Sequence, residues 1–325
     1  MRVHFSLQTI LVLLLATSVF YSGMYQLSLT PPKGKSFAQV ETERALTFRY
    51  HNQAAEKQAL VYIHGKLGSA NDIIYSPLKQ KLEEQFALFA YDRPGSGHSL
   101  ERDGYWSWSP DDFSEHLNEL LNTEELTEPA ILLAHSWGGA IALSYALRYP
   151  EKVRGMVLLA PAAYPWPGRF ATSPSDWFVS SYVLSEFYLR TVFVPLGKVF
   201  GKSVAEAVFS PSPLPQPFIK HVFPLALQPA AFQMAARDTM ELREALKKQS
   251  IHYPRIESPT IILSSPNDTV VPPQIHGGPL SEALPRGEIR YVENVGHNFI
   301  YTASDSIIEA VRDISNQKVP HGKAD

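Results

Sequence analysis

Short apolar runs, separated by segments of helical periodicity, constrain the fold of this 325-residue chain more than any other feature. Several runs are apolar at every position, which is typical of strands in a parallel sheet covered by helices on both faces. The alternation predicts an α/β domain with a mainly parallel sheet and crossover helices. The predicted strands are residues 45–50, 59–63, 86–91, 130–134, 153–159, 260–263 and 288–292.

Ser109 and the residues after it predict the start of one crossover helix. Ser109 is a good N-cap, Pro110 suits the first helical position, and Asp111 places negative charge in the first turn. Apolar residues then recur at helical spacing over 113–121, which predicts one buried stripe. A similar stripe over 307–314 predicts the last helix of the domain.

The segment 161–229 breaks this rhythm, because it holds eleven of the 26 prolines of the chain together with many aromatic residues. Proline interrupts helices, so we expect short kinked helices here rather than one long element. We interpret 163–249 as a helical cap inserted between two strands of the core. The core then comprises 37–162 and 250–316, and a polar tail follows at 317–325.

The N-terminal stretch carries no Asp, Glu, Lys or Arg between Arg2 and Lys33. An apolar segment of about 20 residues is long enough to cross a bilayer as a helix, whereas its short apolar centre also suits a cleaved signal peptide. We interpret 1–27 as a signal anchor with a transmembrane helix, with a cleaved signal as the alternative, and 28–36 as a linker. We therefore expect a membrane-anchored or exported protein. The extracytoplasmic side is the favoured location of the rest of the chain, and the membrane orientation stays open.

The composition excludes several classes of function. The chain has no cysteine, which removes thiol catalysis, disulfides and thiolate zinc sites. A net charge of −3, with basic residues scattered singly, offers no basic face for nucleic acid. No metal-binding pair of the HExxH kind occurs, and we expect neither a metal nor an organic cofactor. The oligomeric state stays open.

Ser136 lies between a predicted buried strand and a predicted helix, in the string AHSWGG. A nucleophile on such a sharp turn needs small neighbours two residues away on either side, and Ala134 and Gly138 meet that need. We therefore predict that Ser136 is a catalytic nucleophile. His135 stands at the variable position of the turn, so we do not expect it to be the base.

The string HGKLGS at 64–69 follows another predicted strand. A glycine-rich turn there can aim backbone N–H groups at the oxyanion of a tetrahedral intermediate. We predict an oxyanion hole formed by the N–H groups of Lys66 and Trp137, with Leu67 as a less favoured alternative to Lys66. The Lys66 side chain is expected to be solvated.

Asp268 and His297 each follow a predicted strand near the end of the chain. Serine is a poor nucleophile at neutral pH and needs a general base, and the base needs a carboxylate that orients its ring. The order Ser136, Asp268, His297 is the order of such triads in α/β-hydrolases. We predict that His297 is the base and Asp268 the orienting acid.

Together the motifs resemble those of the α/β-hydrolase superfamily, in its capped serine hydrolase branch. HGKLG, DRPGSGHS at 92–99 and AHSWGG match the HGxxG, DRPGxGxS and small-x-Ser-x-Gly motifs of that branch, and the resemblance covers roughly 37–316. It implies an eight-stranded sheet with the cap inserted after the sixth strand. It also implies that Asp92 and Arg93 have a structural role in the turn after the fourth strand.

The resemblance implies hydrolysis of an ester, or of a thioester, lactone or amide, through an acyl-serine intermediate. Ser136 stands where related dehalogenases and epoxide hydrolases have aspartate, and HGKLG differs from the HGGP-like form of prolyl iminopeptidases. The aromatic residues of the cap favour an apolar small-molecule substrate. The alternatives are an acyltransferase or C–C bond hydrolase with the same triad, and a non-catalytic ligand-binding protein on the same fold.

Overall fold

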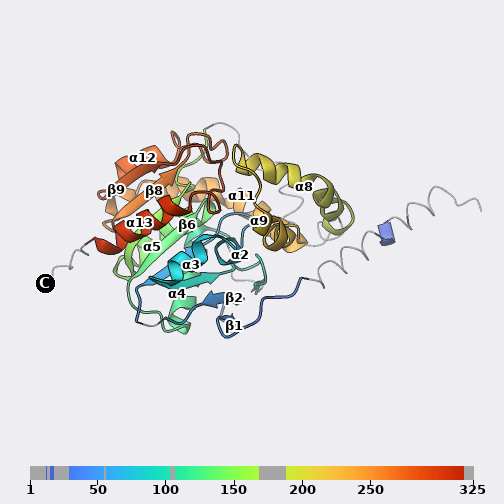
Figure 1. Ribbon diagram of the computed structural model, residues 1–325, viewed down its shortest axis with the longest axis horizontal. Helices are drawn as coiled ribbons and strands as arrows, with labels where there is room; N and C mark the ends of the chain where they lie inside the picture. The colour runs from blue at the N-terminus through green and yellow to red at the C-terminus, as the bar shows by residue number, and fades with distance from the viewer. Residues whose placement is uncertain are drawn as a thin grey trace, which may run out of the picture.

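One mixed sheet forms the centre of the molecule (Figure 1). The computed structural model describes residues 12, 15–17, 29–54, 56–102, 107–167 and 188–317. Eight of the strands lie in the order β1-β2-β4-β3-β6-β7-β8-β9, and a ninth, β5, pairs with β2. The pairs of β2 with β1, β4 and β5 are antiparallel, and all others are parallel. The predicted mainly parallel sheet is therefore confirmed.

Each of the seven predicted runs is a strand, to within one residue at either end. The two strands that the apolar runs did not predict are β1, in which only Val40 is buried, and the two-residue β5. The strands are β1 (Phe37–Glu41), β2 (Ala45–His51), β3 (Ala59–Ile63), β4 (Ala87–Tyr91), β5 (Leu100–Glu101), β6 (Ala130–His135), β7 (Val153–Leu159), β8 (Thr260–Ser264) and β9 (Gly287–Tyr291).

Helices connect the strands and cover the sheet. The α-helices are α2 (Asn71–Ile74), α3 (Leu78–Glu83), α4 (Pro110–Thr123), α5 (Trp137–Arg148), α8 (Val194–Phe209), α9 (Gln216–His221), α10 (Phe223–Ala226), α11 (Pro229–Ser250), α12 (Gly277–Ala283) and α13 (Ser304–Asn316). Three shorter turns of other helical types are η1 (Pro150–Lys152), η2 (Leu189–Phe193) and η3 (Tyr253–Arg255).

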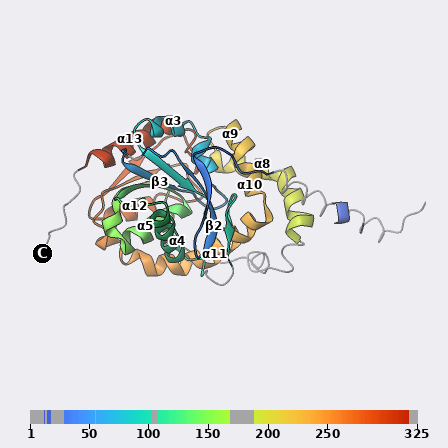
Figure 2. The same ribbon diagram turned by 90° about the horizontal axis from the view of Figure 1, so that it is seen from below.

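The central strands are buried on both faces, as their composition predicted. On β3, Val61 and Ile63 pack in one apolar cluster with α4 and α5, whereas Leu60 and Tyr62 pack in a second cluster with α3 and α13. Side chains alternate between the two faces of a strand, so a strand that is apolar throughout needs cover on both. Figure 2 shows α3 and α13 on one side of the sheet and α4 and α5 on the other.

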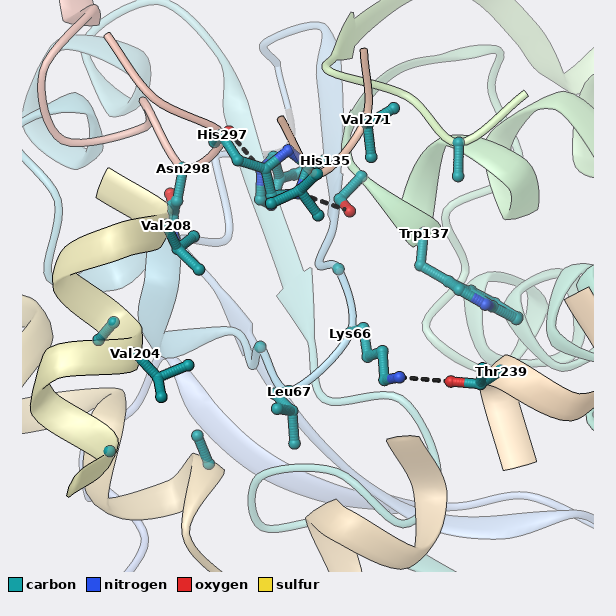
Figure 3. Close-up of a pocket in the computed structure, with 18 of the residues that line it drawn as sticks. Lys66, Leu67, His135, Trp137, Val204, Val208, Thr239, Val271, His297 and Asn298 are labelled. Carbon is teal, nitrogen blue, oxygen red and sulfur yellow. Dashed lines mark hydrogen bonds between the residues drawn. The ribbon is translucent and has the colours of Figure 1, made fainter. Parts of the chain in front are cut away.

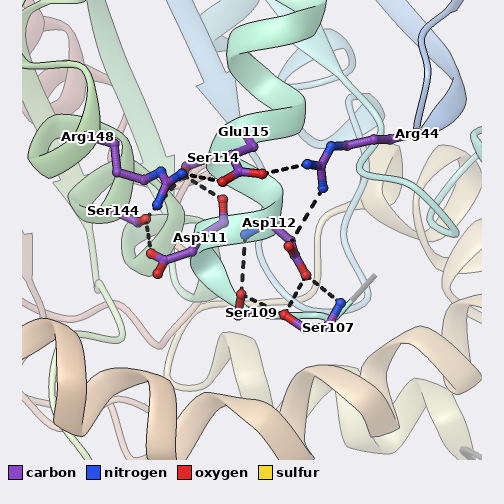
Figure 4. Close-up of polar contacts among 9 residues, drawn as sticks. All are labelled: Arg44, Ser107, Ser109, Asp111, Asp112, Ser114, Glu115, Ser144 and Arg148. Carbon is purple, nitrogen blue, oxygen red and sulfur yellow. Dashed lines mark hydrogen bonds and ion pairs between the residues drawn. The ribbon is translucent and has the colours of Figure 1, made fainter. Parts of the chain in front are cut away.

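The start of α4 joins two other elements. The Ser109 hydroxyl accepts a hydrogen bond from the Asp112 N–H at 3.2 Å, so the predicted N-cap is confirmed. Arg44, which precedes β2, pairs with Asp112 and Glu115, and Glu115 also pairs with Arg148 at the end of α5 (Figure 4). These contacts hold α4 and α5 together on one face of the sheet.

A helical region lies between β7, the sixth strand of the eight-stranded path, and β8. Here α11 is 22 residues long, so the expectation of short segments alone is wrong. The reason is that four of the prolines stand in the first turns of these helices, where the missing N–H costs little. They are Pro195 in α8, Pro217 in α9, Pro224 in α10 and Pro229 in α11.

The predictions for the two ends of the chain concern residues that are largely not described. The signal or anchor segment, 1–27, lies outside the described residues except for 12 and 15–17, and the polar tail lies outside them after Gln317. Among the residues that are described, no helix is long and apolar enough to cross a membrane.

Candidate active site

Ser136 occupies the single-residue turn between β6 and α5. Its φ of 53° and ψ of −118° form a strained conformation for a residue with a side chain, of a kind that costs about 1–3 kcal/mol and gathers at functional sites. Gly138 is required beside it, because a Cβ there would lie 2.4 Å from the Ile63 carbonyl oxygen. The predicted sharp turn is therefore present, and it points Ser136 away from the sheet.

The structure brings the three predicted triad residues together. His297 Nε2 lies 2.9 Å from Ser136 Oγ, and His297 Nδ1 lies 2.7 Å from Asp268 Oδ2. All three side chains are buried. Figure 3 shows His297 at the cavity, beside His135 and Asn298. Both ring nitrogens are thus engaged, one with a hydroxyl and the other with a carboxylate, which is the arrangement that makes a serine nucleophilic.

The Asp268 carboxylate is held by its own loop. Its Oδ1 accepts hydrogen bonds from the N–H groups of Val270 and Val271, at 2.8 and 2.9 Å. This leaves Oδ2 directed at His297. Two backbone donors stabilise the charged form of the carboxylate, so it is suited to orient a ring that becomes positive during a reaction.

The His297 loop is attached to the helical region. The His297 N–H donates to the Val208 carbonyl, at the end of α8, at 2.9 Å. The preceding Gly296 has no room for a side chain, because a Cβ would lie 2.6 Å from that carbonyl oxygen and 2.5 Å from the Ser210 carbonyl oxygen. The position of the ring therefore depends on α8, a relationship that the sequence motifs did not reveal.

The glycine turn after β3 lies against Ser136. A Cβ on Gly65 would be 3.0 Å from the Ser136 Cβ, and the Gly68 N–H donates to the Gly65 carbonyl at 3.2 Å. Leu67 has a φ of 58°, which completes the tight turn. Lys66 and Trp137, whose N–H groups are predicted to form the oxyanion hole, thus belong to the two segments that adjoin Ser136. That role remains a prediction.

The Lys66 side chain is exposed, as expected, but it also makes a hydrogen bond. Its ammonium group donates to the Thr239 hydroxyl on α11. Figure 3 shows the two side chains facing each other across one edge of the cavity. Lys66 therefore links the glycine turn to α11.

Asp92 has the structural environment that was expected. Its two carboxylate oxygens accept the N–H groups of Ala70 and His98, at 2.6 and 2.7 Å. Burial raises the pKa of Asp92 to about 7, although these two hydrogen bonds oppose the shift. The φ of Gly97 is +57°, and a Cβ there would collide with the carboxyl group. Asp92 thus closes its own turn and lies among backbone groups rather than at Ser136.

His135 does not lie on the nucleophile. Its Nε2 is 3.2 Å from the His297 carbonyl oxygen, and the two rings are 5.0 Å apart. Burial lowers the pKa of His135 to about 3, and the nearby His297 contributes to the decrease. The neutral ring donates to a backbone carbonyl, which suits a structural residue of this loop better than a base.

A cavity of about 910 Å³ has Ser136 and His297 in its lining. Most of its wall is apolar, and α8 and its neighbours supply much of that wall. Within the described residues, no group of three His, Asp or Glu side chains is arranged to hold a metal ion. Apolar lining residues from the helical region include Phe193, Phe200, Val204, Phe209, Phe223 and Leu227.

Comparisons with known proteins agree with this geometry. The chain is 29% identical, over 67% of its length, to the pimeloyl-[acyl-carrier protein] methyl ester esterase of Shewanella woodyi, of which it covers 78%. It is 27% identical to a non-heme chloroperoxidase of Kitasatospora aureofaciens, over 79% of this chain and 90% of that one. Its fold is similar to that of a candidate lipase from Acinetobacter baumannii, with a TM-score of 0.69, 21% identity and coverage of 98% and 99% of the two chains. The family model for the alpha/beta hydrolase fold matches residues 58–304. The chain therefore belongs to the α/β-hydrolase family.

Proposed function

We propose that this enzyme is a serine hydrolase that cleaves esters of apolar acids through an acyl-enzyme on Ser136. The observation that carries the proposal is the continuous set of contacts from Asp268 through His297 to Ser136, at 2.7 and 2.9 Å. The strained turn at Ser136 adds support, because it keeps the hydroxyl at the cavity wall.

In the first half of the reaction, Ser136 Oγ attacks the ester carbonyl carbon and its proton moves to His297 Nε2. The carbonyl oxygen becomes negative and accepts hydrogen bonds from the N–H groups of Lys66 and Trp137, which stabilise it. The carbonyl then re-forms, the bond to the alcohol oxygen breaks, and His297 donates its proton to that oxygen. The alcohol leaves, and the acyl group remains on Ser136.

In the second half, His297 removes a proton from water, and the resulting hydroxide attacks the acyl carbon. The bond to Ser136 Oγ breaks, and the serine takes its proton back from His297. The products are the free acid and a restored triad. Asp268 stabilises the protonated ring in both halves.

The preference for apolar acids rests on the cavity and on the relatives. Burying apolar surface contributes roughly 25 cal/mol per Å², so an acyl chain against Phe200 or Leu227 binds without a charged partner. The relative from Shewanella woodyi is named as a methyl ester esterase, which supports the same bond class here.

The test is the rate of hydrolysis of p-nitrophenyl esters from acetate to dodecanoate, measured beside matched anilides. Wild type should cleave esters and favour chains longer than acetate. Ser136→Ala should lose nearly all turnover while keeping the thermal midpoint of wild type. Wild-type rates in Ser136→Ala would contradict the proposal.

We also propose that the N-terminal segment attaches the enzyme to a membrane. The lack of charged residues between Arg2 and Lys33 supports this. The full chain should resist extraction from membranes by carbonate, whereas a chain that starts at Ser28 should be soluble and active. An N-terminus between about residues 18 and 29 in a soluble extract would indicate a cleaved signal instead.

A further inference from the structure

Two polar side chains, Asp72 and Asn298, interrupt the apolar wall of the cavity. They are only 3% and 8% exposed, respectively. Asp72 belongs to α2, directly after the glycine turn, and Asn298 directly follows His297. The proposed mechanism uses neither residue, although both lie beside groups that it does use.

The Asp72 carboxyl is partly satisfied from within the protein. Its Oδ2 accepts the Ser69 N–H at 2.8 Å. Burial raises the pKa of Asp72 to about 7, and the Ser69 N–H and the Asn298 amide both oppose that shift by hydrogen bonding to the carboxyl. The Asn298 side chain therefore lies beside the Asp72 carboxyl.

The oxygen of the Asn298 amide lacks a hydrogen-bond donor within the part of the chain that the structure describes. Asn298 Oδ1 is buried, and no hydrogen-bond donor reaches it among the described residues. A buried acceptor without a donor is unfavourable, and sites with such acceptors discriminate in favour of ligands that supply the donor. Figure 3 shows Asn298 beside His297 and Val208 at the edge of the cavity.

We propose that Asn298 Oδ1 and the Asp72 carboxyl form a subsite for a hydrogen-bond donor on the substrate, a hydroxyl or an amide N–H close to the scissile carbonyl. This inference rests on the proposed hydrolysis at Ser136. The substrate class that it names is an ester with an apolar body and one such donor, rather than a plain alkyl ester.

We expect the donor to lie within a few bonds of the reacting carbon, because the subsite and the nucleophile share one cavity. Asn298 directly follows His297, whose Nε2 lies 2.9 Å from Ser136 Oγ. On the other side, a Cβ on Gly68 would lie 2.8 Å from Asp72 Oδ2, so the carboxyl adjoins the glycine turn. The subsite is therefore bounded by the two loops that surround the nucleophile.

The experiment uses ester pairs that differ only by a hydroxyl in place of a methyl group. Ethyl 3-hydroxybutyrate and ethyl 3-methylbutyrate probe the acid side, and 2-hydroxyethyl and propyl butyrate probe the alcohol side. Proton release gives kcat/KM for each ester with the full-length enzyme. Wild type should prefer the hydroxylated member of at least one pair, and Asn298→Ala should reduce that preference about five- to tenfold.

A further variant separates recognition from a general effect on the cavity. Val204→Ala, which changes an apolar residue of the same cavity, should affect both members of a pair equally.

A wild type without preference in either pair would overturn the subsite, and so would an Asn298→Ala variant that slows both members equally. If no ester is cleaved and a fluorophosphonate fails to label Ser136, the proposed function fails as well. Labelling of Ser136 without any preference overturns the subsite alone.

Discussion

Arg93 and Asp238 form a fully buried, two-armed ion pair between the turn after β4 and the middle of α11. Arg93 Nη1 lies 3.1 Å from Asp238 Oδ1, and Nη2 lies 2.8 Å from Oδ2. The same guanidinium donates to the Gly65 carbonyl at 3.3 Å and stacks on the Trp137 ring at 4.6 Å. One side chain thus connects α11 to both segments that adjoin Ser136.

Removing Asp238 should destabilise the protein strongly. Asp238→Ala leaves the Arg93 charge buried without its partner, which typically costs about 3–5 kcal/mol. Chemical denaturation should therefore give a much lower midpoint than for wild type. Glu244→Gln, at an exposed ion pair on the same helix, is the control and should leave the midpoint unchanged. Equal midpoints for Asp238→Ala and wild type would show that the buried pair does not stabilise the fold.

The parts of this site that the sequence could predict are formed by residues adjacent in the chain, whereas the parts that it could not predict join residues far apart. The Ser136 turn was predictable, because strand, small residues and helix are adjacent in sequence. The partner of Arg93 was not, because Asp238 lies 145 residues away and no local pattern records the pairing. The motif indicated only that Arg93 was structural.

His116 should make stability depend on pH in the acid range. Burial lowers its pKa to about 3, and Arg44 adds to the decrease, whereas an unfolded His titrates near 6.5. Between these values the unfolded chain binds the extra proton, so stability is lost as the pH falls below about 6.5. His116→Gln should make the unfolding free energy fall less steeply, by about 1.4 kcal/mol per pH unit between pH 4 and 6.

Denaturant titrations at several pH values measure this slope for wild type and His116→Gln. The variant also loses the contact between His116 and Thr47, at 3.0 Å. That loss would lower the free energy of unfolding by the same amount at every pH and would leave its slope with pH unchanged. Identical slopes would therefore show that His116 titrates normally in the folded protein.

Val204 should control the preference for acyl chain length. It lines the cavity from α8 and is 65% exposed, which places it at the cavity mouth. Val204→Trp adds bulk there and should lower kcat/KM for an octanoate ester about tenfold, with little effect on an acetate ester. Val199→Trp, on the same helix but outside the described cavity lining, is the matched control. A similar loss in both variants, or in neither, would mean that Val204 does not contact the acyl chain.

The helical region shows a second limit of sequence patterns. Its prolines were expected to break helices, yet four of them start helices, because a first-turn residue needs no N–H for the helix. Proline content alone does not reveal where in a helix each proline lies. The contact of Val208 with His297 was likewise hidden, because a backbone carbonyl has no sequence signature.

The central claim is that Ser136 is the nucleophile, and its most direct test is the site of covalent labelling by a fluorophosphonate. Peptide mass spectrometry of the labelled wild type should find one adduct, on the peptide that contains Ser136, and ester turnover should fall in parallel with labelling. Ser136→Ala should take up no label. An adduct on another residue, or full ester turnover in a fully labelled enzyme, would contradict the account.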